Sequence, residues 1–346
     1  MTIINNRDTK VMQALIKDVC ETVNAHIKIQ KSEFSINGKF PVIDQSTNPI
    51  AGYTDIEKAL LDNGEYVIFG DHTRIIKYVD FPFAQGADGI KILKACNNVL
   101  PKYLYYSLSN LDIPNKGYSR HWGLVSNLVI DVPSQKVQEE IVKILDSFTN
   151  LIDALNEELS LRQKQFEYYR EKLLTFDDNT NMQKICNFAT IQSGKNKERT
   201  DNGQFPLFGS TGLISRTNIY VYEGDYILIA RVGANAGFTY RVNGKFDVSD
   251  NTLIVTIIKN NTINIDYLYH CLIEQNLNKY AKGGGQPLVT SGELKNISIP
   301  IPSLAIQQSI VEKLDAFESL ISSLKEEIAL RQKQYEYYRE KLLTFE

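Results

Sequence analysis

The sequence has no closely spaced cysteines and no long apolar run. Its four cysteines, Cys20, Cys96, Cys186 and Cys271, lie far apart and form no CxxC motif. No apolar stretch approaches the roughly 18 residues of a membrane span. The N-terminal MTIINNRDTKVMQ also lacks the basic and apolar regions of a signal peptide. We therefore expect a cytoplasmic protein with reduced thiols and no membrane contact.

The sequence also lacks the motifs of common nucleotide and DNA enzymes. It contains no G-x-x-x-x-G-K-[ST] phosphate loop. Asn48-Pro49-Ile50 lacks the second proline and the aromatic residue with which an adenine methyltransferase holds a flipped base. The four histidines, His26, His72, His121 and His270, are scattered without the spacing of metal ligands. We therefore predict no catalytic residue and no metal site in this chain.

The net charge of −3 at first argues against a nucleic-acid partner. The charge is unevenly distributed, however. Residues 132–178 carry 6 basic and 10 acidic side chains, and residues 301–346 carry 6 and 8. Residues 1–131 carry 14 of each, whereas residues 179–300 carry 12 basic and 9 acidic side chains. Phosphate binding needs only a local basic surface, so the composition is compatible with DNA binding.

A long internal repeat organises the chain. Residues 132–176 align without a gap to residues 301–345, with 28 identities in 45 positions. The last sixteen residues of the two copies differ only where Phe166 is replaced by Tyr335. Both copies begin with Pro-Ser. Proline blocks continuation of a preceding strand and serine is a good helix N-cap, so we expect a helix to begin at the start of each repeat.

Each repeat is predicted to form one long amphipathic helix, because its apolar residues recur at steps of three and four. In the first copy they are Val137, Ile141, Ile144, Phe148, Leu151, Leu155, Leu159, Phe166, Tyr169 and Leu173. In the second they are Ile306, Ile310, Phe317, Leu320, Leu324, Ile328, Tyr335, Tyr338 and Leu342. About 40 residues at ~1.5 Å each give a helix roughly 60 Å long. Since neither helix would be stable alone, we expect the two to pack antiparallel as a coiled-coil spacer.

The blocks that precede the two helices are faintly related to each other. Gly64–Phe69 resembles Gly224–Ile229, and Tyr103–Tyr105 resembles Tyr267–Tyr269. Both blocks have the mixed patterns of an α/β domain. In the second block the predicted elements are strands over Tyr226–Ala230 and Thr252–Ile258, a hairpin turn at Asn243-Gly244 and a helix around Tyr267–Leu277.

These patterns predict an α+β fold with an internal pseudo-two-fold repeat. We place the first globular domain at residues 1–131 and the first helix at residues 132–178. The second domain then covers residues 179–300 and the second helix residues 301–346. In this arrangement two mixed α/β domains are separated by two long antiparallel helices, and a duplicated ancestor is the simplest origin.

Two loops at corresponding places, ahead of Gly123 and Gly292, combine basic, amide and aromatic side chains. Arginine pairs well with guanine and glutamine with adenine, so such loops suit base recognition. The glycines beside them would allow close approach to a ligand. We predict DNA contacts for Arg74, Tyr118, Arg120, His121, Arg231, Asn235, Lys282 and Gln286. A structural role at the surface or in the core is the alternative for each.

Three motifs then point to a family. They are I/V-P-S-x-x-x-Q at Val132–Gln138 and Ile301–Gln307, I-V-x-x-L-D-x-F at Ile141–Phe148 and Ile310–Phe317, and the shared ending L-R-Q-K-Q-aromatic-E-Y-Y-R-E-K-L-L-T-F. With them, the chain resembles the specificity subunit of a type I restriction–modification system over essentially its full length. In that family two target-recognition domains alternate with two similar helical repeats.

The resemblance implies a non-catalytic subunit that reads a split double-stranded DNA site, one half with each recognition domain. It implies two methyltransferase subunits as partners and, in the full enzyme, two restriction (translocase–nuclease) subunits. S-adenosylmethionine, ATP and magnesium are then expected on the partner subunits only, and no cofactor on this chain. The alternatives are a non-catalytic coiled-coil scaffold that joins two binding domains and a self-contained DNA methyltransferase or nuclease.

The near-identical endings are expected to serve protein contacts rather than DNA. They lie in the acidic helical repeats, and a net negative surface repels DNA. Tyrosine and arginine are enriched at the energetic centres of protein interfaces. We therefore predict that Tyr168, Arg170, Tyr337 and Arg339 form two equivalent docking sites on the outward faces of residues 161–176 and 330–345.

Overall fold

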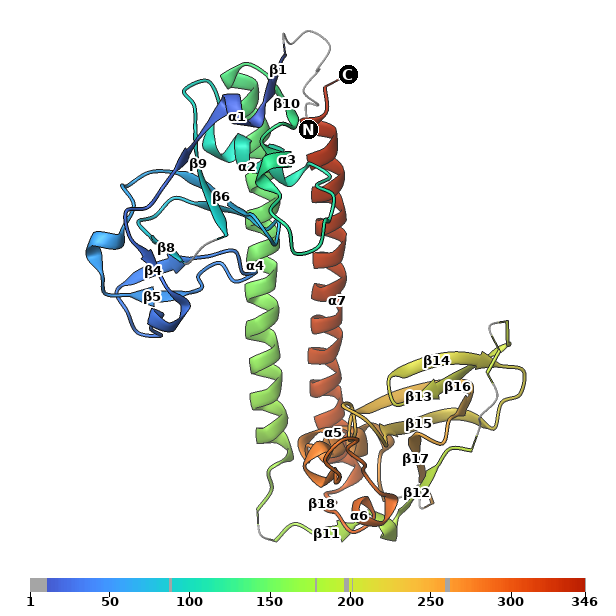
Figure 1. Ribbon diagram of the computed structural model, residues 1–346. Coiled ribbons are helices and arrows are strands. Elements are labelled where there is room, and N and C mark those ends of the chain that lie inside the picture. Colours follow the sequence, from blue (N-terminus) through green and yellow to red (C-terminus); the bar gives the residue numbers. More distant parts are fainter. Residues whose placement is uncertain are drawn as a thin grey trace. The chain divides into compact units, whose positions relative to one another are not determined.

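The computed structural model of the protein describes residues 11–86, 89–177, 179–195, 199–200, 202–258 and 262–345. The chain forms two compact units (Figure 1). Unit 1 comprises residues 1–156 and 327–346, and unit 2 comprises residues 157–326. Each unit thus combines a globular block with the first part of the long helix that follows it and the last part of the other long helix. The expected start of the first domain, within residues 1–10, lies outside the described residues.

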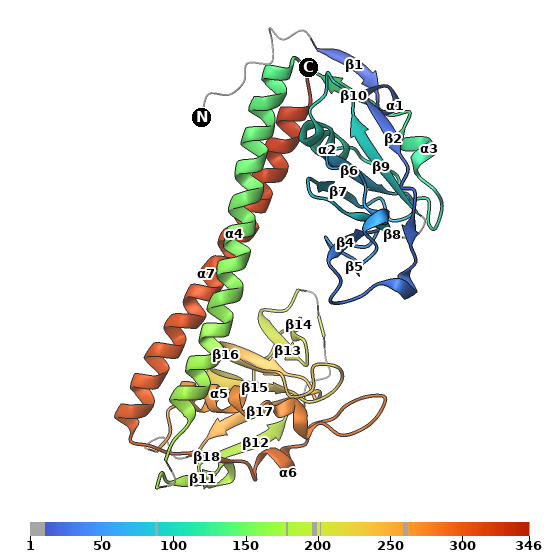
Figure 2. The same ribbon diagram turned by 90° about the vertical axis from the view of Figure 1, so that its left-hand side faces the viewer.

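Unit 1 begins with a mixed α/β block that precedes helix α4 (Figure 2). Its strands are β1 (Met12–Leu15), β2 (Cys20–Val23), β3 (Lys28–Ile29), β4 (Phe40–Ile43), β5 (Gly52–Thr54), β6 (Tyr66–Gly70), β7 (Ile76–Val79), β8 (Ala84–Gly86), β9 (Ile90–Ala95) and β10 (Val129–Val132). Its helices are α1 (Ile16–Val19), α2 (Pro101–Ser109) and α3 (Trp122–Val125), with short 3₁₀ helices at Lys31–Glu33 and Glu57–Ala59.

The strands of unit 1 form three small sheets. One is antiparallel with the order β2-β9-β6-β7, and a second has the order β3-β8-β4-β5, in which β8 runs parallel to β3 and β4. Strands β1 and β10 form an antiparallel pair. All five residues of β6 are buried, as expected for a central apolar strand. In this strand Val67 lies opposite Tyr78 of β7 and Leu93 of β9.

Helix α2 joins the sheet of unit 1 to the long helices. Tyr103 of α2 is fully buried, and its hydroxyl donates to the carbonyl oxygen of Asp131 at 2.6 Å. The same apolar cluster contains Leu145 from the early part of α4 and Leu342 from the late part of α7. Burying each such leucine contributes about 1.5–3 kcal/mol, so the block and both helix segments share one core.

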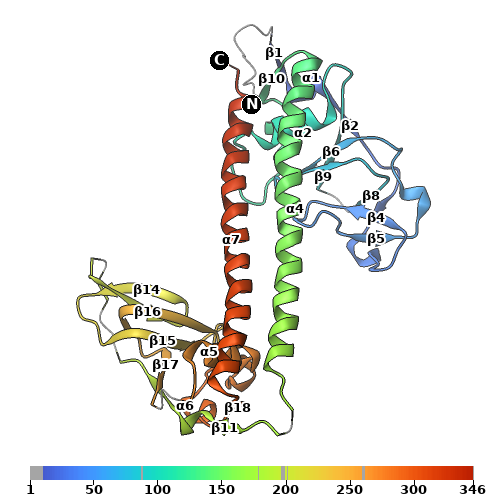
Figure 3. The ribbon, with the colours of Figure 1, turned by 180° about the vertical axis from the view of Figure 1, so that it is seen from behind.

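Unit 2 contains a larger sheet (Figure 3). Its strands are β11 (Met182–Lys184), β12 (Ala189–Ser193), β13 (Phe205–Gly209), β14 (Gly212–Thr217), β15 (Tyr222–Ala230), β16 (Thr239–Val248), β17 (Thr252–Ile257) and β18 (Ser298–Pro300). Helices α5 (Ile265–Glu274) and α6 (Ser291–Leu294) follow the sheet, with 3₁₀ helices at Ile185–Asn187 and Leu277–Tyr280. The six-stranded sheet has the order β12-β17-β15-β16-β13-β14, and only the β13–β16 pairing is parallel.

Both strands predicted in the second block are present: Tyr226–Ala230 lies within β15, and Thr252–Ile258 matches β17 except for its last residue. The predicted hairpin turn at Asn243-Gly244 is wrong. Both residues lie inside β16, where Gly244 pairs with Gly224 of β15. Both glycines have positive φ, +98° and +117°, a conformation that glycine adopts without steric cost. The chain reverses instead between β15 and β16, over residues 231–238.

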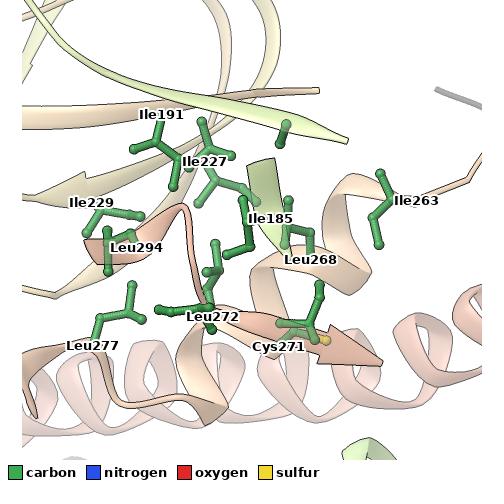
Figure 4. Close-up of a cluster of buried hydrophobic side chains, with 14 of the residues drawn as sticks. Ile185, Ile191, Ile227, Ile229, Ile263, Leu268, Cys271, Leu272, Leu277 and Leu294 are labelled. Carbon is green, nitrogen blue, oxygen red and sulfur yellow. The ribbon is translucent and has the colours of Figure 1, made fainter. Parts of the chain in front are cut away.

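Residues 227–230 of strand β15 in unit 2 are all buried, so both faces of this part of the strand are covered, as expected for its apolar run. Ile227 and Ile229 point into the cluster that Leu268 and Leu272 of α5 complete, as Figure 4 shows. Leu228, on the opposite face, packs in a second cluster. The cluster around α5 also includes Leu314 from the early part of α7, so unit 2 is built on its helices as unit 1 is.

The two long helices are α4 (Gln135–Leu174) and α7 (Leu304–Leu343), of 40 residues each. In each unit the beginning of one helix packs against the end of the other, so the two helices run antiparallel. In unit 1 the rings of Phe148 and Tyr338 stack with centroids 5.4 Å apart. In unit 2 Tyr169 stacks on Phe317 at 5.5 Å.

The predicted apolar stripe is buried mainly where the helices meet a globular block. Ile141 and Ile310 are buried, but Leu151 and Leu320, at aligned positions farther along the helices, are exposed. The inclusion of Ile306 in the stripe is wrong, because its side chain is also exposed. Within the described part of the chain, no helix combines the length and apolar character needed to cross a membrane.

Candidate nucleic-acid interface

In unit 1 the predicted DNA-contacting residues lie in two segments that touch each other. One is the turn at residues 71–75 between β6 and β7, and the other is residues 113–121, ahead of α3. Arg74 has a left-handed backbone with φ of +61°, and its Nη1 donates to the carbonyl oxygen of Ile113 at 2.7 Å. The half-buried side chain of Arg74 therefore holds the second segment in place.

His121 does not offer its side chain to a ligand, which corrects its predicted role as a DNA contact. It is fully buried. Its ring Nδ1 lies 2.9 Å from the carbonyl oxygen of Asp71, and its Nε2 accepts from the backbone N–H of Lys116 at 3.2 Å. The buried carboxylate of Asp71 accepts from the backbone N–H groups of His121 and Trp122 at 2.9 and 2.7 Å. His121 thus fixes the loop that carries the exposed candidates.

Tyr118 and Arg120 remain available at the surface of unit 1. The side chain of Tyr118 is 88% exposed and stacks on the ring of His72, with centroids 4.7 Å apart and planes 10° apart. Arg120 is also exposed. His72 was not predicted as a site residue, since it lies 46 positions before Tyr118 and only the fold brings the two rings together.

In unit 2 the candidates again lie in two segments, residues 231–238 and 282–288, that are hydrogen-bonded to each other. The N–H of Gly233 donates to the carbonyl oxygen of Pro287 at 3.0 Å. A Cβ on Gly237, whose φ is +93°, would lie 2.4 Å from the backbone nitrogen of Asn278. Only glycine therefore permits this close approach of the loop to the segment after α5.

The four predicted residues of unit 2 differ in how free they are. Asn235 and Gln286 are exposed. Arg231 is half-buried, and its Nη1 donates to the carbonyl oxygen of Asp250 at 3.1 Å. The mostly exposed ammonium of Lys282 pairs with Glu293, and this hydrogen bond lowers the pKa of the Glu293 carboxyl. The two amides thus lie exposed at the surface, whereas both cations already have partners.

Phe238 was missed by the sequence interpretation. Its exposed ring stacks on Tyr240, with centroids 5.8 Å apart and planes 24° apart. Beside it, a cavity of about 550 Å³ is lined by Asn235, Phe238, Asn276 and Asn278 among others. This side of the loop thus offers both an aromatic face and amide groups, a combination suited to nucleobases.

The two pairs of segments occupy equivalent places in the two blocks. The N–H of His121 donates to the carbonyl oxygen of Asp71, and the N–H of Val289 donates to the carbonyl oxygen of Arg231, both at 2.9 Å. Asp71 and Arg231 each directly follow an inner strand of their sheet, β6 or β15. A common scaffold thus displays different side chains in the two units.

The shared endings of the long helices carry two equivalent exposed tyrosines. Tyr168 is 57% exposed and Tyr337 is 58% exposed. The ammonium of Lys172 lies 5.8 Å from the ring centre of Tyr168, and that of Lys341 lies 5.7 Å from the ring centre of Tyr337. We call these two surfaces, Tyr168 with Lys172 and Tyr337 with Lys341, the tyrosine patches.

Arg170 and Arg339 do not lie on the outward face, which corrects their predicted placement. The Arg170 side chain is only 17% exposed, and its Nε donates to Glu274 of α5 at 2.8 Å. Its guanidinium also lies over the ring of Phe166 at 5.3 Å. Arg339 lies over Tyr335 at 5.4 Å, and its Nε is buried without a hydrogen-bond partner among the described residues. A spacing of four along the helix places each arginine beside the ring that packs on its block.

A group of ionisable side chains joins the second block to the helices of unit 2. Three potential metal ligands lie close together here: His270 of α5 and Asp315 and Glu318 of α7 have ligand atoms within 4.8 Å of one another. The guanidinium of Arg241 lies among them, with Nη1 3.0 Å from Asp315 and Nη2 2.5 Å from Glu318. Because Arg241 already supplies the positive charge, we interpret this group as a structural junction.

The buried thiols are poor nucleophiles. Burial is the main cause that raises the pKa of Cys20 and of Cys271 to about 12, so both stay protonated at neutral pH. All four cysteines are free. The two buried thiols, Cys20 and Cys271, therefore fit a packing role.

Comparison with known proteins assigns the chain to a family. Residues 9–161 and 178–330 each match the type I restriction modification DNA specificity domain. The specificity subunit of the Escherichia coli type I restriction enzymes EcoR124I and EcoR124II is 31% identical over 88% of this chain and 87% of its own length. A putative type I specificity subunit of Mycoplasma pneumoniae, S.MpnORF507P, is 26% identical over 95% of this chain and 96% of its own length.

Solved structures share the fold at low sequence identity. The type I restriction–modification S subunit from M. genitalium superposes with a TM-score of 0.73 and 15% identity, over 99% of this chain and 98% of that one. A chain from a structure of the type I R-M system, described in terms of complex assembly and conformational transition, superposes with a TM-score of 0.55 and 15% identity. The superposition covers 96% of this chain and 97% of that one. The chain therefore belongs to the type I restriction modification DNA specificity domain family, the non-catalytic DNA-recognition components of type I restriction–modification systems.

Proposed function

We propose that this chain reads a bipartite duplex DNA site, one half with each globular block. The observation that carries the proposal is the equivalent placement of the two loop pairs, joined by the hydrogen bonds from His121 to Asp71 and from Val289 to Arg231. Two half-sites of different sequence require different side chains, and the two blocks present such side chains on loops with the same backbone arrangement. A scaffold that only joined two domains would have no need of such paired loops.

The exposed side chains suit the edges and faces of bases. The amides of Asn235 and Gln286 have the donor and acceptor geometry that reads adenine, and the guanidinium of Arg120 suits guanine. The rings of Tyr118 and Phe238 offer apolar contact with the thymine methyl group or a stacking face. In this proposal Arg74 and His121 position the first loop, while Arg231 and Lys282 supply positive charge to the second.

The tyrosine patches are proposed to bind two copies of one methyltransferase subunit. Their near-identical geometry supports this, because one partner surface would fit both. Two restriction subunits would join in the full enzyme. S-adenosylmethionine, ATP and magnesium would be held by these partners, and the complex would act on DNA in the cytoplasm. Names of the relatives support the general assignment, since the E. coli protein is the specificity subunit of a type I restriction enzyme.

The experiment that tests this function is selection from a random duplex pool with the chain alone and with its methyltransferase partner. We expect the complex to enrich one split sequence with two constant parts and a spacer of fixed length. If the complex enriched no sequence, the alternative of a coiled-coil scaffold that only joins two domains would be favoured. Methylation or cleavage by the chain alone would favour a self-contained enzyme.

A further inference from the structure

The second block is tied to the spacer helices through one arginine of its sheet. Arg241 lies in β16, opposite Ile227 of β15. Its Nη1 contacts Asp266 of α5 at 2.9 Å and Asp315 of α7 at 3.0 Å, and its Nη2 contacts Glu318 of α7 at 2.5 Å. The planar guanidinium has donors in fixed directions, so three carboxylates from two helices restrict its orientation.

Neighbouring side chains of α5 reinforce this junction. Arg241 lies over the ring of Tyr269 at 4.4 Å, and the Tyr269 hydroxyl donates to Glu318 at 3.2 Å. The fully buried His270 places Nε2 3.0 Å from Asp315. Each carboxylate of α7 is therefore held both by the sheet and by α5. A rotation of the block on the helix would break several of these contacts at once.

Among the described residues of the first block, no side chain of the sheet makes such a direct link to the long helices. Tyr78 of β7 occupies the position equivalent to Arg241, because it pairs with Val67 as Arg241 pairs with Ile227. Its ring contacts the ammonium of Lys102 at 5.3 Å, and it is Lys102 of α2 that reaches the helix carboxylate. In unit 1 the connection from sheet to long helix thus runs through a flexible lysine.

The aligned helix positions show the same difference. Asp146 corresponds to Asp315 and accepts from Lys102 and from the Tyr106 hydroxyl, both at 2.7 Å. Thr149 stands where the second repeat has Glu318, so unit 1 has one helix carboxylate at this junction where unit 2 has two. The charge pattern therefore makes the second junction the stiffer one.

We propose that Arg241 is a positioning residue that fixes the second recognition loop relative to the spacer helix and so makes the spacing between half-sites strict. This inference rests on the proposed bipartite recognition. Arg241 lies three residues after Phe238, at the base of the loop of residues 231–238. One added base pair shifts a half-site by about 3.4 Å and about 35°. Base contacts tolerate a displacement of about 0.5 Å and a rotation of about 10–20°. Even a modest rotation of the block would therefore change which spacer lengths the chain can bind.

The test uses the full chain in complex with its methyltransferase partner. Binding is measured on duplexes that keep both half-sites and lengthen or shorten the spacer by one base pair. We expect the parent to lose at least about 10-fold in affinity for either change, a loss of about 1.4 kcal/mol. Arg241→Met should reduce this loss to about 3-fold while selecting the same two half-site sequences. Arg241→Lys should fall between them, because one ammonium cannot hold three carboxylates in a fixed plane.

Matched variants separate positioning from general damage. Arg216→Met removes an arginine of the same sheet that, among the described residues, donates to the carbonyl oxygens of Gly203 and Gln204 in its own block. This change should leave the dependence of binding on spacer length (the spacer profile) as in the parent. Lys102→Met tests the first block, and it should broaden the range of spacer lengths that bind less than Arg241→Met does. Glu318→Gln keeps the side-chain shape and should widen the profile even if Arg241→Met does not fold.

Two results would overturn the inference in different ways. If Arg241→Met, Arg241→Lys and Glu318→Gln all keep the parent's spacer profile, Arg241 does not set spacing although bipartite recognition stands. If the parent itself binds all spacers equally, the proposed bipartite function fails, and the inference fails with it.

Discussion

Gln138 and Gln307, aligned residues of the two repeats, make the same three hydrogen bonds in the two units. Gln138 Oε1 accepts from the N–H of Leu100 at 2.9 Å, and its Nε2 donates to the carbonyl oxygens of Asn98 and Pro133 at 3.0 and 2.9 Å. The bonds of Gln307 are the counterparts, to Asn264, Thr262 and Pro302 at 2.8, 3.0 and 2.9 Å. Both side chains are fully buried and lock the start of a long helix to the segment before α2 or α5.

Replacing either glutamine with leucine should destabilise its unit. Three buried backbone groups would lose their partner, and each unsatisfied group costs about 1–3 kcal/mol. We expect Gln138→Leu and Gln307→Leu to lower the local opening free energy by about 3 kcal/mol each, which speeds hydrogen exchange of the Leu100 or Asn264 amide more than 100-fold. The control is Gln163, at an exposed position later in α4, and Gln163→Leu should change neither rate. Unchanged protection in the two buried variants would contradict this role.

The tyrosine patches should set the stoichiometry of the complex. Tyr168→Ala or Tyr337→Ala removes an exposed aromatic side chain that we place at the centre of an interface, where such losses cost 2 kcal/mol or more. Native mass spectrometry should show one bound methyltransferase subunit for each single variant and none for the double variant. Arg170→Met is the comparison, because Arg170 is paired with Glu274 inside unit 2. It should weaken unit 2 but leave two partners bound, whereas a double tyrosine variant that still binds two would exclude the patches.

Each loop should affect only its own half-site. Asn235→Ala should relax base selection by about 1–3 kcal/mol at a position in one half, and Tyr118→Ala should weaken the other half. Sequencing of selected duplexes measures both effects. Asn296→Ala removes an exposed amide that donates to the Gly292 carbonyl in α6, and it should leave both halves unchanged. If a substitution in one loop changed the selected sequence of both half-sites, the two blocks would not recognise their half-sites independently.

His270 should make unit 2 less stable in mild acid. Burial lowers the pKa of His270 from 6.5, although Glu318 and Asp315 oppose this shift. Between the folded pKa and 6.5 the unfolded chain binds more protons, so the contribution of the neutral ring is present above about pH 6.5 and is lost as the pH falls. We expect this residue to add a slope of up to about 1.4 kcal/mol per pH unit to the free energy of unfolding in that window.

Urea unfolding of His270→Gln and of the parent between pH 5 and 7.5 measures this slope. The variant should show the shallower dependence. His26→Gln, at an exposed position, should match the parent. If the parent and the His270 variant showed equal slopes, folding would not lower the pKa of His270, and this prediction would be wrong.

The parts of the fold that could be predicted from the sequence depend on local patterns. The two 40-residue helices follow from spacing of three and four within each repeat. Their pairing follows from the shared apolar stripe, and its antiparallel direction from the domain that lies between them in the sequence. Strands β15 and β17 could likewise be predicted from their apolar runs in the sequence. Asn243-Gly244 failed as a turn because its conformation depends on Gly224, twenty residues earlier in the partner strand.

The candidate site was predicted less well, because side-chain direction depends on distant residues. His121 has the composition of a binding residue, but Asp71, 50 positions away, holds it in the core. Arg170 was placed outward because nothing near it in the sequence indicates Glu274, 104 positions away. Tyr168 and Tyr337 were placed correctly on the surface, since one tyrosine of each pair must turn from the stripe. The junction around Arg241 joins three separate segments and has no local signature.

The most direct test of the central claim is the DNA selected by a chimera. Residues 179–300 are replaced by the corresponding block of a relative with a different target, and the chimera with its methyltransferase partner is used to enrich random duplexes. We predict that one half of the enriched sequence changes while the other half stays that of the parent. A change in both halves, or in neither, would contradict the account that each block reads its own half of the site.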